Sequence, residues 1–296
     1  MKVLILGGSG MLGHKLWQIL ASRCDTYATL RRSPPQFLHS LNLDRSHAIE
    51  GVSVEDFDSV TRAIAEIQPN VVVNCIGIVK QDAAGKDPIS SITVNSLFPH
   101  RLARLTANSG ARLIHLSTDC VFSGRHGNYS ESDVPDAEDL YGRSKLLGEV
   151  TNERCLTIRT SMIGRELSGA HGLLEWFLSQ DGGRVRGFKQ ARFSGFTTNA
   201  LADVIAKIIM DHPDLSGVWN VASSPINKFD LLTLVKQTYG LAIEIEPDES
   251  FVCDRSLNDS RFREATGFKR PSWPEMIEDI RNDPTPYGEI RRISDS

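Results

Sequence analysis

Short apolar runs alternate with segments expected to be helical along the first half of the chain. The runs predict strands at residues 2–6, 26–30, 71–77 and 112–116. Between them we expect helices at residues 11–21, 56–67 and 87–107, and the second of these carries apolar side chains at helical spacing. Runs that are apolar throughout are typical of strands buried on both faces of a parallel sheet. The pattern therefore predicts an α/β fold with a doubly wound parallel sheet.

The pattern loosens in the second half of the chain. We expect helices at residues 173–178, 199–211 and 229–239, a strand at 217–222, a loop at 33–43, and a loop or strand at 182–189. Residues 1–160 should form the unit that holds the sheet, and residues 161–283 a smaller lobe. Residues 197–222 are expected to pack back near the first unit. Residues 284–296 mix Pro, Gly and charged residues, which predicts a loose tail.

A glycine-rich segment stands between the first strand and the first helix. Gly7, Gly10 and Gly13 are spaced three residues apart, with Met11 and Leu12 before the last glycine. Glycine permits a tight turn, a close approach of backbone to a pyrophosphate, and close packing of helix on sheet. Glycine spacing alone also occurs in ordinary turns. Because a strand precedes it and a helix follows, we interpret this segment as the phosphate loop of a Rossmann-type dinucleotide site.

The second predicted strand ends in two arginines rather than in a carboxylate. A carboxylate at this place binds the ribose 2′-hydroxyl of NAD, whereas arginine accommodates the 2′-phosphate of NADP. Arg31 and Arg32 therefore favour NADP(H) as cofactor, with NAD(H) as the alternative. The competing interpretation is that both arginines are solvent-exposed and select no cofactor.

Composition and charge exclude several kinds of site. The 296 residues include 33 Lys and Arg against 37 Asp and Glu, a net charge of −4 that predicts no binding to nucleic acid or to a membrane surface. The five cysteines show no CxxC pair and no metal-ligand spacing with histidines, so no metal is predicted. Unpaired cysteines and the absence of a long apolar segment are expected of a cytoplasmic protein.

A tyrosine and a lysine lie four residues apart in Tyr141-Gly142-Arg143-Ser144-Lys145. On a helix this spacing puts both side chains on one face. A neighbouring ammonium is expected to lower the pKa of the phenol, which makes acid–base work near neutral pH accessible. Thr118 follows the predicted strand at 112–116, and its hydroxyl could donate to a substrate carbonyl. A phosphate loop, a hydroxyl and this pair together predict a hydride-transfer site.

The chain resembles the extended short-chain dehydrogenases, and within them the dTDP-4-dehydrorhamnose reductases and related sugar-nucleotide reductases. The resemblance covers nearly the whole chain, and it is carried by residues 7–13, 74–77, 94–95, 117–124, 141–145, 148–149 and 158–161. It implies a Rossmann fold of the extended type with a smaller C-terminal substrate lobe. It also implies that Thr118, Tyr141 and Lys145 are catalytic and that Asn95 supports the lysine.

The same resemblance implies which residues bind the two reactants. The cofactor residues would be Gly7, Gly10, Met11, Leu12, Gly13, Arg31, Arg32, Cys75, Ile76, Gly77, Asn95 and Lys145. The substrate residues would be Thr118, Asp119, Cys120, Tyr141 and Arg255. Arg255 lies in a segment where these reductases hold a nucleotide diphosphate, although a surface ion pair is an equal alternative. Members of the family often have Tyr where Cys120 stands and Trp where Met162 stands.

The function that follows is NADP-dependent reduction of a keto group on a nucleotide-activated deoxysugar, in sugar-nucleotide or cell-surface polysaccharide biosynthesis. The partner would be a small nucleotide sugar, and we also consider a homodimer. A nucleotide-sugar epimerase or dehydratase on the same scaffold is the first alternative. The second is a non-catalytic NADP-binding regulatory subunit, such as that of methionine adenosyltransferase.

Overall fold

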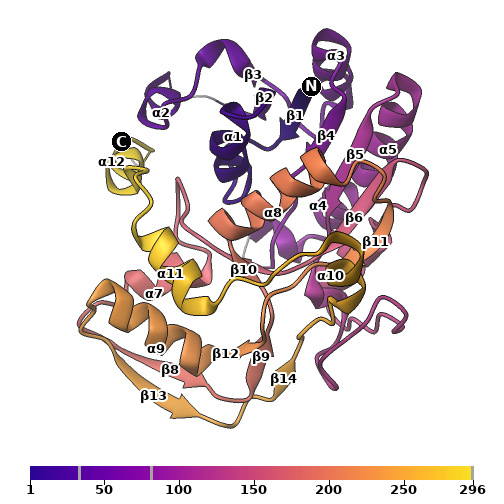
Figure 1. The fold of residues 1–296 in the computed structure, drawn as a ribbon. Helices are drawn as coiled ribbons and strands as arrows, with labels where there is room; N and C mark the ends of the chain where they lie inside the picture. Colours follow the sequence, from indigo (N-terminus) through magenta and orange to yellow (C-terminus); the bar gives the residue numbers. More distant parts are fainter. Residues whose placement is uncertain (33–34, 81–82, 295–296) are drawn as a thin grey trace.

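A seven-stranded parallel sheet forms the centre of the computed structural model, which describes residues 1–32, 35–80 and 83–294. The strands lie in the order β11-β6-β5-β4-β1-β2-β3 (Figure 1), and every neighbouring pair is parallel. Their bounds are β1 (Lys2–Leu6), β2 (Asp25–Leu30), β3 (Ala48–Glu50), β4 (Val71–Asn74), β5 (Arg112–Leu116), β6 (Cys155–Arg159) and β11 (Gly217–Asn220). The strand order reverses between β1 and β4, where doubly wound sheets bind ligands at the carboxyl ends of the strands.

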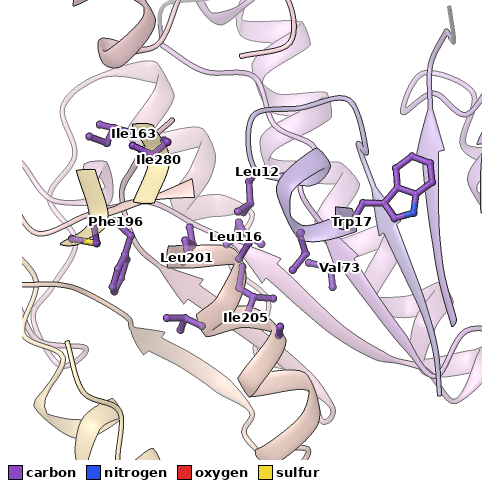
Figure 2. Packing of buried hydrophobic residues seen from close by; sticks show 14 of the residues in the cluster. Leu12, Trp17, Val73, Leu116, Ile163, Phe196, Leu201, Ile205 and Ile280 are labelled. Atoms are coloured by element: carbon purple, nitrogen blue, oxygen red, sulfur yellow. The ribbon is translucent and has the colours of Figure 1, made fainter. Parts of the chain in front are cut away.

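Helices cover both faces of this sheet. Alternate residues of β1 divide between two cores: Val3 and Ile5 belong to one, and Leu4 and Leu6 to the other. The first core also receives α1 (Gly13–Ala21) and α8 (Thr198–Asp211), whose Leu201 and Ile205 lie near Leu116 in Figure 2. The second receives α3 (Phe57–Ile67) and α5 (Phe98–Ser109). Burial on both faces explains why the strands are apolar throughout.

The smaller lobe lies below the sheet in Figure 1 and shares the first core. Its helices are α7 (Leu173–Leu178), α9 (Lys228–Tyr239), α10 (Ser260–Thr266) and α11 (Trp273–Arg281). Its strands are β7 (Met162–Ile163), β8 (Arg184–Phe188), β9 (Ala191–Phe193), β10 (Phe196–Thr197), β12 (Ile226–Asn227), β13 (Glu244–Asp248) and β14 (Cys253–Asp254). Within residues 161–283, α8 packs on α1, β11 pairs with β6, and α10 contacts β11.

Several elements differ from the expectations. Within the predicted loop 33–43, of which 33–34 lie outside the described residues, the structure has the helix α2 (Pro35–Ser40). The expected helix 87–107 is divided into α4 (Pro88–Ser91), a π-helical segment η3 (Ile92–Leu97) and α5. Short 3-10 turns occur at η1 (Arg45–His47), η2 (Ala83–Lys86) and η4 (Asp119–Val121).

The end of the chain also differs. The expectation of a loose tail over residues 284–296 is wrong for the helix α12 (Tyr287–Ser294), where Tyr287 and Ile290 are buried. Their apolar contacts are long-range in sequence, so composition alone could not indicate them. Among the described residues, no helix is long and apolar enough to cross a membrane.

Candidate active site

The glycine loop has a geometry that side chains would disrupt. Gly7 has a φ of +86°, in the region that favours glycine. A Cβ on Gly13 would lie 2.1 Å from the carbonyl oxygen of Gly7, so the start of α1 lies directly against the loop. A Cβ on Gly10 would meet that same oxygen at 3.3 Å. In the described part of the chain no side chain caps the N-terminus of α1, so this end of the helix offers backbone N–H groups to an anion.

Arg31 and Arg32 lie at the carboxyl end of β2, and both are exposed. Across from them, the pKa of Glu55 is lowered, first by a hydrogen bond from Ser53 and to a smaller degree by the charge of Arg31. Both arginines thus follow the strand next to β1, and their side chains are exposed.

Asn95 connects the end of β4 to the helix that carries the Tyr–Lys pair. Its side chain accepts a hydrogen bond from the N–H of Ile78 at 2.9 Å and donates to the carbonyl of Ile78 at 3.0 Å. It also donates to the hydroxyl of Ser144 at 3.2 Å. Asn95 lies in the π-helical segment η3, and such segments often mark functional positions because they redirect one side chain.

Gly77 and Lys145 lie close together at this end of the sheet. A Cβ on Gly77 would be 3.4 Å from Oδ1 of Asn95 and 3.8 Å from Nζ of Lys145. Cys75, two residues earlier, is partly buried, and burial raises the pKa of its thiol to about 12. The thiol is therefore neutral at physiological pH, and in this segment Gly77 is the residue that lies near the lysine.

Lys145 is buried at the last turn of α6 (Leu140–Leu147). Its Nζ donates a hydrogen bond of 2.6 Å to the carbonyl oxygen of Leu116. Burial lowers the pKa of the ammonium to about 8, and the nearby carboxylate of Glu149 opposes this shift. Lys145 is therefore charged at neutral pH and close to its titration point.

Tyr141 lies in the first turn of the same helix, whose N-cap Asp139 accepts a hydrogen bond from the N–H of Gly142 at 2.8 Å. Burial raises the pKa of the Tyr141 phenol, and a hydrogen bond with Thr118 partly opposes the increase. This net direction is opposite to the one expected from a neighbouring ammonium, because Lys145 directs its Nζ to Leu116 and burial dominates. Tyr141 is consequently a protonated phenol in this structure.

Thr118 and the two residues after it turn at the end of β5. The Thr118 hydroxyl accepts a hydrogen bond from the N–H of Cys120 at 3.1 Å and is 3.2 Å from a carboxylate oxygen of Asp119, to which it donates. Burial raises the pKa of Asp119, while the charges of Arg255 and Lys228 lower it. Burial likewise raises the pKa of the Cys120 thiol to about 12.

Two cations from the smaller lobe face this turn. Arg255 follows β14 and donates from Nε to the carbonyl of Phe122 at 2.9 Å. Lys228 begins α9, with its Nζ 3.7 Å from the ring centre of Phe193. Burial lowers the pKa of Lys228 to about 8, and the negative charges that Asp119 and Cys120 can carry raise it. Arg255 forms no ion pair with the residues that the structure describes, and its printed hydrogen bond goes to the segment after β5.

The sequence pattern did not indicate Lys228 as a candidate site residue. It placed the helix start at residue 229, but Asn227 is the N-cap and accepts a hydrogen bond from the N–H of Asp230 at 2.8 Å. Asn is a favoured N-cap residue, so Asn227 was the available signal that Lys228 occupies the first helical position.

A buried ion pair, Glu149 with Arg159, lies next to the turn after β5. Glu149 accepts two hydrogen bonds from Arg159, from Nε at 2.8 Å and from a terminal nitrogen at 2.7 Å. The hydroxyl of Ser117 donates to the same carboxylate at 2.7 Å. The Arg159 and Glu149 side chains are 6% and 7% exposed. This pair connects α6, the turn after β5 and the end of β6.

Comparisons with solved structures agree with this architecture. A structure of a hypothetical dTDP-4-dehydrorhamnose reductase from Sulfolobus tokodaii has a TM-score of 0.77 and 25% identity, covering 92% of this chain and 98% of that one. The dTDP-4-dehydrorhamnose reductase of Bacillus anthracis in complex with NADP has a TM-score of 0.77 at 20% identity, covering 95% and 98%. At 20% identity, the similarity to the Bacillus anthracis structure shows a shared fold and no more.

Curated relatives match different shares of the chain. The dTDP-4-dehydrorhamnose reductase of Streptomyces griseus is 35% identical over 147 residues, 49% of this chain and 43% of that protein. Methionine adenosyltransferase 2 subunit beta of Mus musculus is 33% identical over 150 residues, and the match spans only 41% of that protein. The spore coat polysaccharide biosynthesis protein SpsK of Bacillus subtilis is 26% identical over 252 residues, 82% of this chain and 81% of that protein.

The family model described as the RmlD substrate binding domain matches residues 1–283. This match includes the glycine loop, the turn after β5, the Tyr–Lys helix and most of the smaller lobe. The chain therefore belongs to the RmlD substrate binding domain family.

Proposed function

We propose that this protein is an NADP-dependent reductase that acts on a keto group of a nucleotide-activated deoxysugar. The observation that supports this most is the arrangement at the end of β5. There the Thr118 hydroxyl, in the turn after β5, acts on the pKa of the Tyr141 phenol, and Lys145 hydrogen-bonds to the carbonyl of Leu116, the last residue of β5. A hydroxyl, a protonated phenol and an ammonium thus meet beside a glycine loop.

The glycine loop has the properties that a dinucleotide requires. The positive φ of Gly7 and the close contact of Gly13 with Gly7 make the loop tight, and no side chain of the described residues caps the start of α1. Residues 7–13 would hold the pyrophosphate, Arg31 and Arg32 the 2′-phosphate, and Lys145 with residues 75–77 and Asn95 the nicotinamide end. When bound, NADPH supplies the hydride.

The protein's own contribution is to position the substrate and move a proton. Because burial raises its pKa, Tyr141 is held in the protonated form that a reduction needs. Its phenol would donate a proton to the carbonyl oxygen of the substrate, and Thr118 would donate a hydrogen bond that holds this oxygen in line. The ammonium of Lys145 would then stabilise the phenolate that remains.

Arg255 and Lys228 would bind the diphosphate of the nucleotide sugar. Two cations face one buried carboxylate, Asp119, so this part of the site carries an excess of positive charge. Arginine binds phosphate oxygens with two donors, and a lysine adds a point charge. In this proposal residues 1–160, with 197–222, form the cofactor domain, and 161–283 otherwise form the substrate lobe.

A panel of nucleotide-activated keto sugars tests this function. We expect the purified protein to consume NADPH with at least one of them and to yield the corresponding alcohol. A product of altered stereochemistry, or one that has lost water, without net NADPH consumption would instead identify an epimerase or dehydratase.

A regulatory role is the competing function, because the similarity to methionine adenosyltransferase 2 subunit beta covers 50% of this chain. It predicts a stable complex with a partner enzyme and no turnover of any nucleotide sugar. The presence of Thr118, Tyr141 and Lys145 together favours the reductase.

A further inference from the structure

The C-terminal segment 283–294 lies almost entirely beyond residues 1–283, which the family model matches. It nevertheless packs tightly, since Tyr287 is only 3% exposed. In Figure 1 α12, in yellow, lies at the left of the view, on the same side as α2. We refer to residues 283–294 as the C-terminal strap.

One set of contacts ties the strap to α1. Lys15 forms a 2.5 Å ion pair with Asp283, and the two side chains are 7% and 2% exposed. Lys15 also donates to the hydroxyl of Thr285 at 2.9 Å, and Gln18 donates to that hydroxyl at 3.2 Å. These contacts fix the strap on the outer side of the helix that follows the glycine loop.

A second set reaches the glycine loop itself through His14. Nδ1 of His14 lies 2.8 Å from the carbonyl oxygen of Gly10, and Nε2 lies 2.9 Å from the hydroxyl of Tyr287. A carbonyl oxygen only accepts, so Nδ1 carries the proton. Burial lowers the pKa of His14 to about 4, so the ring is neutral and Nε2 accepts from Tyr287. The result is a directed chain of hydrogen bonds, from Tyr287 to His14 to Gly10.

The strap also holds a loop of the smaller lobe. Arg291 donates two hydrogen bonds to the carbonyl of Glu166, at 3.0 and 2.9 Å. The carboxylate of Glu166 in turn accepts from the N–H groups of His171 and Gly172, at 2.8 and 3.2 Å. A Cβ on Gly172 would lie 2.7 Å from the terminal methyl of Met11, so this loop rests against the glycine loop. The strap is therefore linked to the glycine loop in two ways, through His14 of α1 and through the loop at Glu166 in the smaller lobe.

We propose that the C-terminal strap positions the glycine loop for the cofactor, and that Tyr287 is a positioning residue which acts through His14 on Gly10. The inference rests on the proposed use of a dinucleotide. The carbonyl of Gly10 and the N–H of Met11 belong to one planar trans peptide and point in opposite directions. Holding the carbonyl toward His14 therefore directs the N–H of Met11 to the side away from His14.

A double-mutant cycle tests this chain of contacts. Tyr287→Phe removes the hydroxyl and leaves a buried nitrogen of His14 without its donor, which should raise the dissociation constant for NADPH by about fivefold to tenfold. His14→Leu should have an effect of the same size. If the residues act in series, the double variant should bind NADPH no more weakly than the weaker single variant.

Thr285→Val is the matched control, because it loosens the strap on α1 and removes a second partner of the Tyr287 phenol, while the hydrogen bonds of His14 to Tyr287 and Gly10 remain. We expect it to leave the NADPH dissociation constant within about twofold of the wild type, since the chain to Gly10 is intact. Hydrogen exchange without nucleotide gives a second measurement. Amides of residues 7–13 should exchange faster in Tyr287→Phe than in Thr285→Val.

The outcomes separate the strap from the proposed function. If the wild type binds NADPH and Tyr287→Phe binds it equally well, with unchanged exchange at residues 7–13, the positioning role is wrong. Equal weakening by Thr285→Val would also overturn it, because the effect would then be general loosening. Failure of the wild type to bind any dinucleotide would overturn the proposed function, and with it the strap's role toward the cofactor.

Discussion

Nζ of Lys145 donates a 2.6 Å hydrogen bond to the carbonyl oxygen of Leu116, the last residue of β5. The same helix carries Tyr141, whose phenol hydrogen-bonds to Thr118 in the turn after that strand. Two contacts thus fasten α6 to the end of one strand. The positions of the three groups depend on this attachment as much as on the four-residue spacing along the helix.

Replacing Tyr141 by Phe tests the proton donor. We expect kcat to fall by about 100-fold or more, because the general acid is lost, while NADPH binding is retained. The measurement is NADPH consumption with a nucleotide keto sugar, together with titration of NADPH binding. Tyr239→Phe, at the end of α9, serves as the control and should keep full activity. Unchanged NADPH oxidation by Tyr141→Phe would contradict the assignment.

The pH dependence of kcat tests Lys145. Its pKa is lowered from 10.5 to about 8, so it loses its charge as the pH rises through this value. We expect kcat to decrease along a basic limb centred near pH 8 if the ammonium is required. Lys228→Met should keep this basic limb, because Lys228 lies near Asp119 and Arg255, among the residues proposed to bind the substrate. A kcat that stays constant from neutral to strongly alkaline pH would exclude a requirement for the charged lysine.

The contribution of Lys145 to the free energy of unfolding should increase over the pH range in which kcat decreases. Between about 8 and 10.5 the unfolded chain binds a proton at Lys145 that the folded chain does not. The free energy of unfolding contributed by this group therefore rises with pH. Measuring the thermal unfolding temperature and kcat over the same pH range thus shows whether the decrease in kcat reflects titration at the site or unfolding of the protein.

Lys228→Met tests the substrate lobe. Removing a cation that faces Asp119 and Arg255 should raise KM for the nucleotide sugar by about tenfold, and leave NADPH affinity unchanged. Lys236→Met, on the same helix α9, is the control and should leave both values as in the wild type. If Lys228→Met weakened NADPH binding instead, Lys228 would have to be assigned to the cofactor site.

Arg31→Ala and Arg32→Ala test cofactor selection. Loss of a cation beside the 2′-phosphate should weaken NADPH binding by about tenfold for each variant, with little change for NADH. Arg23→Ala removes an exposed arginine that pairs with Asp203, and it should change neither affinity. Tighter binding of NADH than of NADPH by the wild type would contradict the role of the two arginines.

The sequence indicated those parts of the site that are local in the chain. The glycine loop, the strands and the Tyr141–Lys145 pair are each set by neighbouring residues, and the structure has them in the predicted order, although the strand predicted at 71–77 ends at Asn74. Contacts between distant residues were not accessible in this way. His14 and Tyr287 are 273 positions apart. The raised pKa of Tyr141 was missed for the same reason, since burial is a property of the folded site.

Glu149→Gln tests the buried ion pair and its connection to the site. Arg159 would remain buried without a full counter-charge, which should lower the free energy of unfolding by about 3–5 kcal/mol. Denaturant titration measures this, and the exposed Glu153→Gln should change it by less than about 0.5 kcal/mol. Equal stability of the two variants would contradict a structural role.

Glu149→Gln should also change the pH at which kcat decreases. The carboxylate of Glu149 raises the pKa of Lys145 against the effect of burial. Without this negative charge the pKa of Lys145 falls further, so the basic limb of kcat should shift below pH 8. Glu153→Gln should leave the limb in place. A limb that stays at the same pH in Glu149→Gln would mean that a group other than Lys145 controls it.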